Sequence, residues 1–295
     1  MIDYYPYIDF NAIKLGELSE SLLDYECAIK SYSKALDRLS NYPGDRMQPM
    51  LMAQDLAERI DKAKKSLALG TSVLKFEPWK LSKSSFVKGS QCHKYLFLDK
   101  YKKQEKTPFS EEKKELFARG HQFEEKVRSR DFPNGINVKD VVGDFAYFNS
   151  YTNYLLQVNN DTTIYEATII EDDVLVMCDI LKKDVSGNID IYEIKLNKEI
   201  NEAILQDLAI QYYVCSKRFG HSLNSFNVVF SQGESADNWV IKNLLDELED
   251  HVEETVRRID VFKDTLQHEE PDIAMGEHCN KPYECEFIDY CKNKC

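Results

Sequence analysis

The first part of the chain carries apolar residues at the three- and four-residue spacing of amphipathic helices. From residue 8 to residue 69 these residues alternate with charged ones in a helical pattern. Pro43 and Gly44 interrupt the pattern and are expected to end the second helix. A third helix is predicted from five apolar residues, namely Met52, Leu56, Ile60, Ala63 and Leu67. We therefore expect helices alone before residue 70.

Small and aromatic residues in the first two predicted helices fall at the offsets of a known repeat. They are Leu15, Gly16, Tyr25, Ala28, Tyr32 and Ala35, and the stretch resembles one tetratricopeptide repeat, a helical hairpin. Because a repeat buries its apolar face only against neighbours, the third helix is expected to act as a cap. Residues 1–70 are thus predicted to form a helical appendage, which either offers a docking surface to a protein partner or packs on the main domain.

A new pattern begins near residue 80. Ser82 or Ser84 can cap a helix. The inward positions of this helix are Phe86, Cys92, Leu96 and Leu98. A second helix is predicted over residues 111–130, with Gly120 in its middle. A glycine inside a helix costs about 1 kcal/mol relative to alanine, so Gly120 is expected to mark close packing against another backbone.

Beyond residue 137 the helical spacing gives way to predicted strands. Residues 172–183 and 188–196 are rich in Val, Ile, Leu and Tyr, and the turn-forming residues 184–187 separate them, which predicts a β-hairpin. A helix at 201–218, a strand at 226–230 and a long acidic helix at 240–267 follow. Mixed strands and helices in this order predict an α/β or α+β domain over residues 80–295.

Composition and charge narrow the class of protein. In a chain of 295 residues, no apolar run reaches the roughly 20 residues of a membrane span, and the first residues lack the order of a signal peptide, so a cytoplasmic protein without membrane contact is expected. The net charge of -13 argues against a protein that coats nucleic acid, because such a protein usually carries a basic face. A nuclease can still hold DNA through a local basic strip. Candidates for such a strip, or for a merely solvated loop, are Lys94, Lys100, Lys102, Lys103 and Lys106.

Three residues of the predicted hairpin combine in a way typical of metal chemistry. Glu193 and Lys195 are two positions apart on a strand and share a face, and a symmetric hairpin places Asp179 within one residue of them. Two close carboxylates repel unless a cation lies between them, and oxygen ligands favour Mg²⁺ or Mn²⁺. A lysine beside the ion can orient a water and offset charge on a phosphodiester. The alternative is a solvated cross-strand ion pair.

Four of the eight cysteines stand out by position, Cys92 near the start of the main domain and Cys279, Cys285 and Cys291 near its end. Cytosolic thiols stay reduced, so clustered cysteines there indicate metal binding. The last three are spaced six positions apart, wider than the ligand pairs of structural zinc sites. Cys295 could replace one ligand. Cys27, Cys178 and Cys215 are expected to be small core residues.

Together these features resemble the PD-(D/E)XK nuclease superfamily over residues 80–295. The resemblance rests on Asp179, on Glu193-x-Lys195 at a strand end, and on the helix with Asp207 and Gln211. The remote cysteines are similar to those of the RecB-like branch, whose AddB-type and CRISPR-adaptation exonucleases carry an iron-sulfur cluster. The spacing within the tail departs from that of better-known members, which have a tighter first pair. The resemblance implies a mixed sheet flanked by helices and a four-iron four-sulfur cluster on the four cysteines, with zinc as the alternative.

The resemblance also implies roles for single residues. Asp179 and Glu193 would bind Mg²⁺ or Mn²⁺ with the carbonyl of Ile194, and Lys195 would be the catalytic lysine. Members often place a histidine four residues after a glycine, where this chain has Glu124 after Gly120; Glu124 is therefore a candidate ligand, with His121 nearby. Gln211 and Tyr212 are candidate DNA contacts, although the family's Gln-x-x-x-Tyr is absent.

Four further residues have supporting roles in this interpretation. Tyr283 and Phe287 are expected to shield the cluster, and His278 to modulate it. Glu166 either supports the metal site or forms a surface ion pair.

The expected activity is hydrolysis of DNA, by an exonuclease acting on single-stranded or unwound ends, in repair, CRISPR-linked or phage-related processing. The alternatives are a DNA- or protein-binding module without activity on the same fold, and a zinc-stapled interaction protein.

Overall fold

A computed structural model of the chain describes residues 4–21, 24–68, 80–142, 145–197, 199–232 and 237–294. The chain divides into two compact units, Met1–Glu77 and Pro78–Cys295. Their boundary falls in the interval that the sequence leaves between the two predicted domains. Among the described residues, the helices include none with the length and apolar character needed to cross a membrane.

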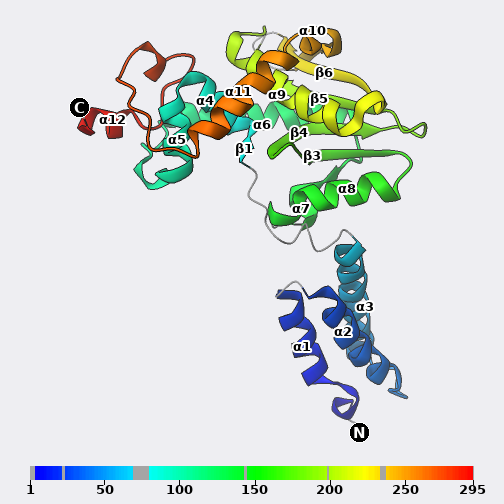
Figure 1. Cartoon of the computed structure of the whole chain (residues 1–295). Coiled ribbons are helices and arrows are strands. Elements are labelled where there is room, and N and C mark those ends of the chain that lie inside the picture. Colours follow the sequence, from blue (N-terminus) through cyan, green and yellow to red (C-terminus); the bar gives the residue numbers. More distant parts are fainter. Residues whose placement is uncertain are drawn as a thin grey trace. The chain divides into compact units, whose positions relative to one another are not determined.

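The first unit is helical, with η1 (Tyr5–Tyr7), α1 (Phe10–Ser21), α2 (Tyr25–Ser40) and α3 (Met47–Ala68), drawn in blue in Figure 1. Helix α2 begins at the cap Asp24, whose carboxylate accepts the Cys27 N–H. Tyr32 is fully buried, and a Cβ on Gly16 would lie 2.4 Å from the Tyr32 ring, so a glycine is required where α1 meets α2. Leu15 is 48% exposed and is not a packing residue, contrary to the prediction from the repeat pattern.

The second unit opens with β1 (Leu81–Ser82), followed by α4 (Lys83–Gln91), α5 (His93–Tyr101), η3 (Lys103–Glu105) and α6 (Glu111–Asp131). Ser82 and Ser85 form a reciprocal capping box that starts α4, which confirms Ser82 as the cap. The predicted single helix is divided at Cys92, which is extended (φ -165°, ψ 124°) and ends α4 while starting α5. The expected close packing at Gly120 is wrong, because a Cβ there would meet no atom of the described residues within 4 Å.

In the described part of this unit, a mixed sheet of seven strands forms the centre. Its strands are β2 (Ile136–Asn137), β3 (Thr162–Glu171), β4 (Val174–Lys183), β5 (Ile189–Lys195), β6 (Leu223–Gln232) and β7 (Asn238–Asn243), adjacent in that order, and β1 pairs with β4. Strands β3, β4 and β5 are antiparallel, and β6 lies parallel to β5 after the crossover helix α9 (Glu202–Phe219). The predicted mixed α/β class is therefore correct.

The predicted hairpin is formed by β4 and β5. The Asp184 carboxylate accepts the N–H groups of Ser186 and Asn188 at 2.8 and 2.9 Å, and Gly187 supplies a φ of 87°. Asp172 and Asp173, which the sequence placed in the strand, instead form the preceding turn with positive φ. The turn geometry thus fixes the register of the two strands that carry the candidate site residues.

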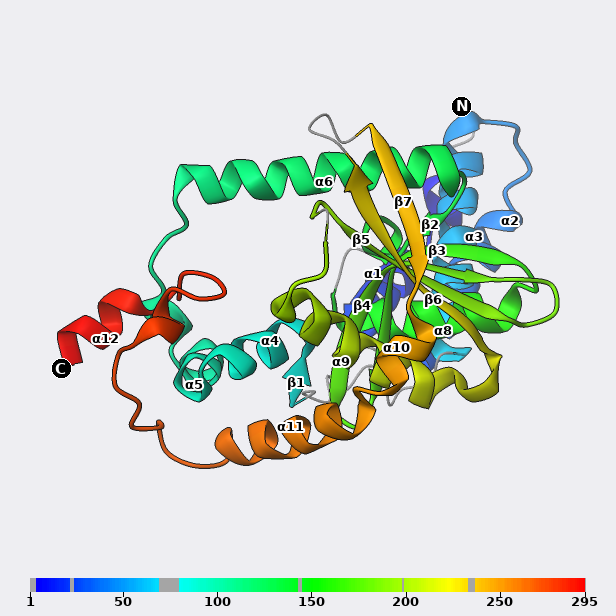
Figure 2. The same cartoon turned by 90° about the horizontal axis from the view of Figure 1, so that it is seen from above.

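Helices cover both faces of the sheet (Figure 2). On one face α9 packs with α4, α8 (Phe148–Val158) and α11 (Val252–Thr265) over the main apolar core. On the other face α6 places Phe123 and Val127 against Ile180 of β4 and Val229 of β6. The remaining elements are short, namely α7 (Val138–Val142), η4 (Phe145–Tyr147), η5 (Gly220–Ser222), α10 (Leu245–Glu249), η6 (Glu277–Cys279) and α12 (Ile288–Lys294).

The predicted helix over residues 240–267 is wrong in its first part. Residues Asn238–Asn243 form the edge strand β7, antiparallel to β6, and only Val252–Thr265 is a long helix. Trp239 explains the difference, because its ring packs edge-on against Phe123 of α6 at 5.8 Å between centroids. This tertiary contact outweighs the helical tendency of the acidic sequence that follows.

Candidate active site and cysteine cluster

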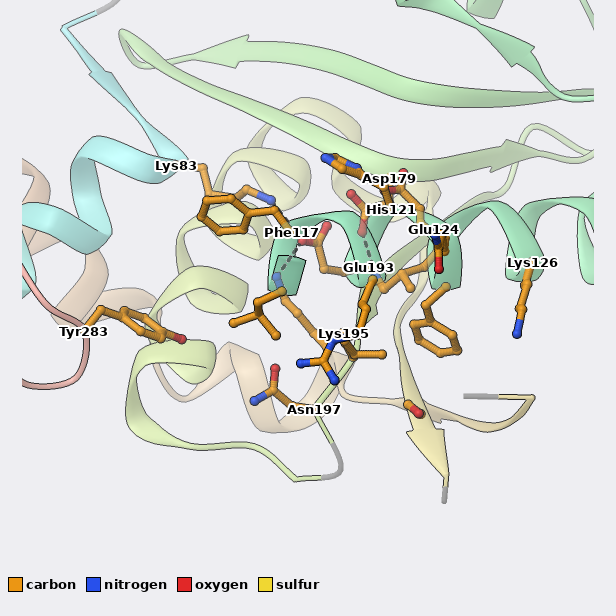
Figure 3. Close-up of a pocket in the computed structure, with 18 residues that line it drawn as sticks. Lys83, Phe117, His121, Glu124, Lys126, Asp179, Glu193, Lys195, Asn197 and Tyr283 are labelled. Carbon is orange, nitrogen blue, oxygen red and sulfur yellow. Dashed lines mark hydrogen bonds and ion pairs between the residues drawn. The ribbon is translucent and has the colours of Figure 1, made fainter. Parts of the chain in front are cut away.

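Candidate residues from three elements lie together in one open cleft beside the sheet. The cleft has a volume of about 1140 Å³, and Figure 3 shows the side chains around it. Strand β4 contributes Asp179, strand β5 contributes Glu193 and Lys195, and helix α6 contributes Glu124. Four residues that the sequence marked in separate segments are therefore brought together.

Asp179 lies beside the strand that carries the Glu-x-Lys pair. Ile180 pairs with Tyr192, so continuing the antiparallel register places Asp179 opposite Glu193, one residue from the symmetric expectation. The Asp179 Oδ2 atom accepts the Ile194 N–H at 2.6 Å. Ile194 also lines the cleft, and metal binding through its carbonyl stays a prediction.

Glu193 is the central carboxylate of the site, and the residue is only 1% exposed. Its Oε1 atom accepts hydrogen bonds from Lys195 Nζ at 2.8 Å and from Lys83 Nζ at 2.9 Å. Burial opposes ionisation, but the two ammonium groups outweigh it and lower the pKa of Glu193 to about 2. Glu193 is thus an ionised carboxylate, and its buried Oε2 atom has no hydrogen-bond partner among the described residues.

Lys195 joins Glu193 to a further carboxylate on α9. Its Nζ atom lies 2.5 Å from Asp207 Oδ2 as well as 2.8 Å from Glu193 Oε1. Burial disfavours the ammonium, but Asp207 and Glu193 outweigh this effect and hold the pKa of Lys195 above its usual range. Lys195 is therefore an ammonium at neutral pH and not a base.

Lys83 belongs to the site but was missed in the sequence. It is the first residue of α4, and besides Glu193 it lies 4.0 Å from Asp207 Oδ1. The pairing of Ser82 with Leu175 in the β1–β4 ladder brings it to the cleft. A lysine after a helix cap carries no chemical signal of its own, so only this long-range pairing could reveal it.

Arg128 of α6 was also missed and connects the acidic residues. Its Nη2 atom donates to Glu166 Oε1 at 2.9 Å and to the Asp179 carbonyl at 3.0 Å, and it forms an ion pair with Glu124. Lys139 approaches the other oxygen of Glu166 at 2.6 Å. Glu166 is thus part of a largely buried network that contacts the metal-ligand candidates, and not of a surface ion pair.

Two other acids at the cleft resist ionisation. Burial, followed by the neighbouring charge of Glu193, raises the pKa of Asp179 well above its usual value. Burial also raises the pKa of Glu124, although Arg128 opposes the rise. His121 is 81% exposed at the side chain, and its Nδ1 atom lies 3.8 Å from Glu124 Oε2.

Both candidate DNA contacts on α9 face inward. Gln211 is fully buried and its Nε2 atom lies 3.4 Å from Asp207 Oδ2. Tyr212 is 6% exposed and its ring packs edge-on against Phe226. The helical face that carries them covers the sheet, so the structure contradicts a surface role for both.

The predicted lysine strip is largely engaged within the protein. Lys94 and Lys102 lie 3.6 and 2.9 Å from Glu270, and Lys106 lies 2.6 Å from Asp99. Lys100 and Lys103 are exposed. Three of the five lysines are therefore already paired with carboxylates of the chain, which weakens the strip as a DNA-binding surface.

Cys92, Cys279, Cys285 and Cys291 line one small cavity of their own. Burial raises the pKa of the Cys285 thiol to about 11, and Cys291, Cys92 and Cys279 add to the rise. Metal coordination would offset the mutual repulsion of four such thiolates. As the described residues stand, no group of three or more His, Cys, Asp or Glu side chains is arranged to hold a metal ion. Cys295 lies outside the described residues.

The surroundings of this cavity agree with the prediction only in part. Phe287 is fully buried beside Cys285, as expected of a shielding residue, and His278 lines the cavity. Tyr283, however, is 49% exposed and lines the large cleft, so its predicted shielding role is wrong.

Cys27, Cys178 and Cys215 are free as well. Cys178 and Cys215 are buried, as predicted, with sulfurs 3.6 Å apart. Cys27 is only half-buried.

The raised pKa of Asp179 leads to a prediction on stability. Because the folded protein holds this proton more tightly than the unfolded chain, its stability falls as pH rises above the ordinary aspartate pKa. Asp179→Asn keeps an oxygen that can accept the Ile194 N–H and removes the carboxyl group whose ionisation destabilises the fold. That destabilisation is about 1.4 kcal/mol for each unit by which the pKa is raised. Without added divalent ions, the variant is expected to be more stable than the wild type at pH 8, in denaturant unfolding.

The same comparison at pH 4 provides the control, because the wild-type carboxyl is then largely protonated. The advantage of the variant should shrink there. An advantage that is unchanged between pH 4 and pH 8 would show that charge at Asp179 is not its source.

Comparison of the chain with family models, with curated proteins and with solved structures gives no match.

Proposed function

We propose that the Pro78–Cys295 unit is a divalent-metal-dependent nuclease of the PD-(D/E)XK type, in its RecB-like branch, that hydrolyses phosphodiester bonds of DNA with single-stranded or unwound ends. The observation that carries the proposal is the meeting of Asp179, Glu193 and Lys195 in one open cleft. A solvated ion pair, the alternative for these residues, does not account for a Glu193 that is 1% exposed and whose Oε2 atom has no partner among the described residues.

The chemistry of the donors, carboxylate oxygens that line one cleft, suits a hard cation, although among the described residues no three such side chains are arranged to hold an ion. Glu193 Oε2 has no hydrogen-bond partner among these residues, Asp179 gains from a nearby positive charge, and Glu124 lines the same cleft. Bound Mg²⁺ or Mn²⁺ would supply positive charge that stabilises the developing charge of the phosphodiester. Asp179, Glu193 and Glu124 would hold it, with the carbonyl of Ile194 as the predicted further ligand.

Lys195 has the position and the charge for its proposed role. Its ammonium group donates to Glu193 Oε1 at 2.8 Å, and the residue lines the cleft. An ammonium so placed can orient a water and hydrogen-bond a phosphate oxygen as negative charge builds. Asp207 fixes its orientation at 2.5 Å. We assign Lys195 the catalytic role and Asp207 a positioning role.

The four cysteines are proposed to hold a structural four-iron four-sulfur cluster. The support is that thiols from residue 92 and from the C-terminal segment line one cavity under apolar cover from Tyr95, Leu98 and Phe287. Such a cluster would tie the C-terminal segment to α4 and α5. A single zinc ion is the alternative for the same thiols.

The proposal is tested with the whole chain, purified without oxygen, and a labelled single strand of DNA. We expect degradation with Mn²⁺ and none in EDTA. Glu193→Gln removes the charge of the proposed ligand and should lower the cleavage rate by at least about 100-fold. Losses of this size are usual when one group that stabilises the charge of a transition state is removed. Glu125→Gln, at an exposed position of α6, is the matched control and should cleave normally. No Mn²⁺-dependent degradation by the wild type would refute the proposal.

One observation favours a second function, a nucleic-acid-binding module without activity. Lys83 and Lys195 both form ion pairs with Glu193, and Arg128 forms one with Glu124. The chain itself therefore partly neutralises the carboxylates that a metal ion would need. Binding of the labelled strand without cleavage in Mn²⁺ would favour this function over hydrolysis.

A further inference from the structure

Two exposed aromatic side chains line the cleft that holds the carboxylates. Phe117 projects from α6 and is 44% exposed, and Tyr283 comes from the C-terminal segment and is 49% exposed. Figure 3 shows Tyr283 extending from its loop toward the group formed by Glu193 and Lys195. Exposed aromatic rings are costly to leave in water, and two of them in one cleft indicate a ligand with flat apolar faces.

The charge of the cleft differs from that of the whole chain. Although the chain carries a net charge of -13, the cationic side chains among the described lining residues outnumber the acidic ones. The acids are Asp179, Glu193 and Glu124. The cations are Lys83, Arg119, Lys126 and Lys195, of which Lys126 also pairs with Asp237 at 2.6 Å. Local positive charge combined with aromatic rings matches a ligand that carries both phosphates and bases.

We propose that Phe117 and Tyr283 form an aromatic clamp on which bases of a single strand stack, with Arg119 beside its phosphates. The inference rests on the proposed function and names the substrate feature that the cleft recognises. In a duplex the bases stack on one another and their faces are hidden, so the clamp selects unpaired nucleotides. It gives no preference for base sequence, since every base has a flat face.

The clamp also gives the cysteine segment a part in binding. Tyr283 lies between Cys279 and Cys285, and its backbone carbonyl accepts a hydrogen bond from Gln91 Nε2 at 2.7 Å. The same amide donates to the His278 carbonyl at 2.7 Å. Gln91 is the last residue of α4, so the segment that carries Tyr283 is fixed to the helix that begins with Lys83.

The test compares two probes of equal length by fluorescence anisotropy, an oligothymidylate strand and a strand of abasic nucleotides with the same phosphates. Ca²⁺ replaces Mn²⁺ so that binding is measured apart from cleavage. We expect the wild type to bind oligothymidylate at least about 10-fold more tightly, since stacking of one base contributes on that scale. Phe117→Ala and Tyr283→Leu should each lose about 10-fold on oligothymidylate, with little change on the abasic strand.

Three controls separate stacking from damage to the fold. Tyr283→Phe and Phe117→Tyr keep a ring and should stay within about 2-fold of the wild type. Phe10→Ala removes a phenyl group of similar exposure, 50%, from the other unit and should change nothing. Equal affinity of the wild type for both probes, equal losses on both probes, or no binding to either would overturn the clamp.

The outcome for the nuclease activity is read separately on the Mn²⁺ gel. If the protein binds oligothymidylate through the two rings but does not cleave DNA, the clamp is supported and the proposed nuclease activity is refuted. A protein that cleaves while both ring variants bind normally refutes the clamp alone.

Discussion

Lys195→Met is expected to lower Mn²⁺-dependent cleavage by about 10²- to 10³-fold, the usual effect of losing one donor that stabilises a transition state. The protein should stay folded, because Lys83 remains 2.9 Å from the same oxygen of Glu193 and keeps that buried charge paired. Initial rates on a labelled single strand measure the effect, and circular dichroism checks the fold. Lys195→Arg should also be impaired, because the planar guanidinium cannot reproduce the two contacts of one nitrogen atom.

Lys100→Met is the matched control, since Lys100 is exposed and is not among the residues that line the cleft. Its rate should equal that of the wild type. Wild-type cleavage by Lys195→Met would refute the catalytic role of Lys195, whereas equal losses in both variants would point to a general effect of lysine removal.

Cys92→Ser is expected to lose most of the bound iron, the brown colour and much of the thermal stability of the second unit. If loss of the metal site lowers the free energy of unfolding by at least about 3 kcal/mol, the midpoint of thermal unfolding falls by roughly 10 °C in a unit of this size. Iron and zinc analysis, a visible spectrum and a melting curve of protein purified without oxygen measure these effects. The large apolar core of the unit does not include Cys92, so the sheet itself should survive.

Cys27→Ser provides the matched control, because Cys27 is half-buried in the other unit. This variant should keep its iron. Zinc in place of iron in the wild type would refute the cluster, and full iron content in Cys92→Ser would remove Cys92 from the ligand set.

The parts of the site that the sequence could predict are those set by local structure. Glu193 and Lys195 share a face because strand geometry alternates every two residues, and Asp179 is brought near by a turn of a few residues. The turn chemistry of Asp184 and Gly187 limits the error in register to one position. The cap of α4 at Ser82 is likewise a local signal.

The parts that could not be predicted depend on contacts between distant segments. Lys83 reaches Glu193 from 110 positions away, and Arg128 reaches the Asp179 carbonyl from 51. Tyr283 lies between two cysteines, so the sequence suggested a shielding role at the cysteines and gave no sign that the side chain lines the cleft. Trp239 turned an expected helix into a strand through a contact with Phe123. In each case the deciding partner is a tertiary neighbour, which periodicity and spacing do not encode.

Helix α4 has a mechanical consequence. It is nine residues long, which at 1.5 Å per residue gives about 13 Å, and it carries Lys83 at its first position and Cys92 directly after its last. A hydrogen-bonded helix of this length moves as a rigid rod, so a displacement of the thiol end is transmitted to the ammonium end. We therefore expect any change that shifts Cys92 to change also the distance between Lys83 and Glu193, which is 2.9 Å in this structure.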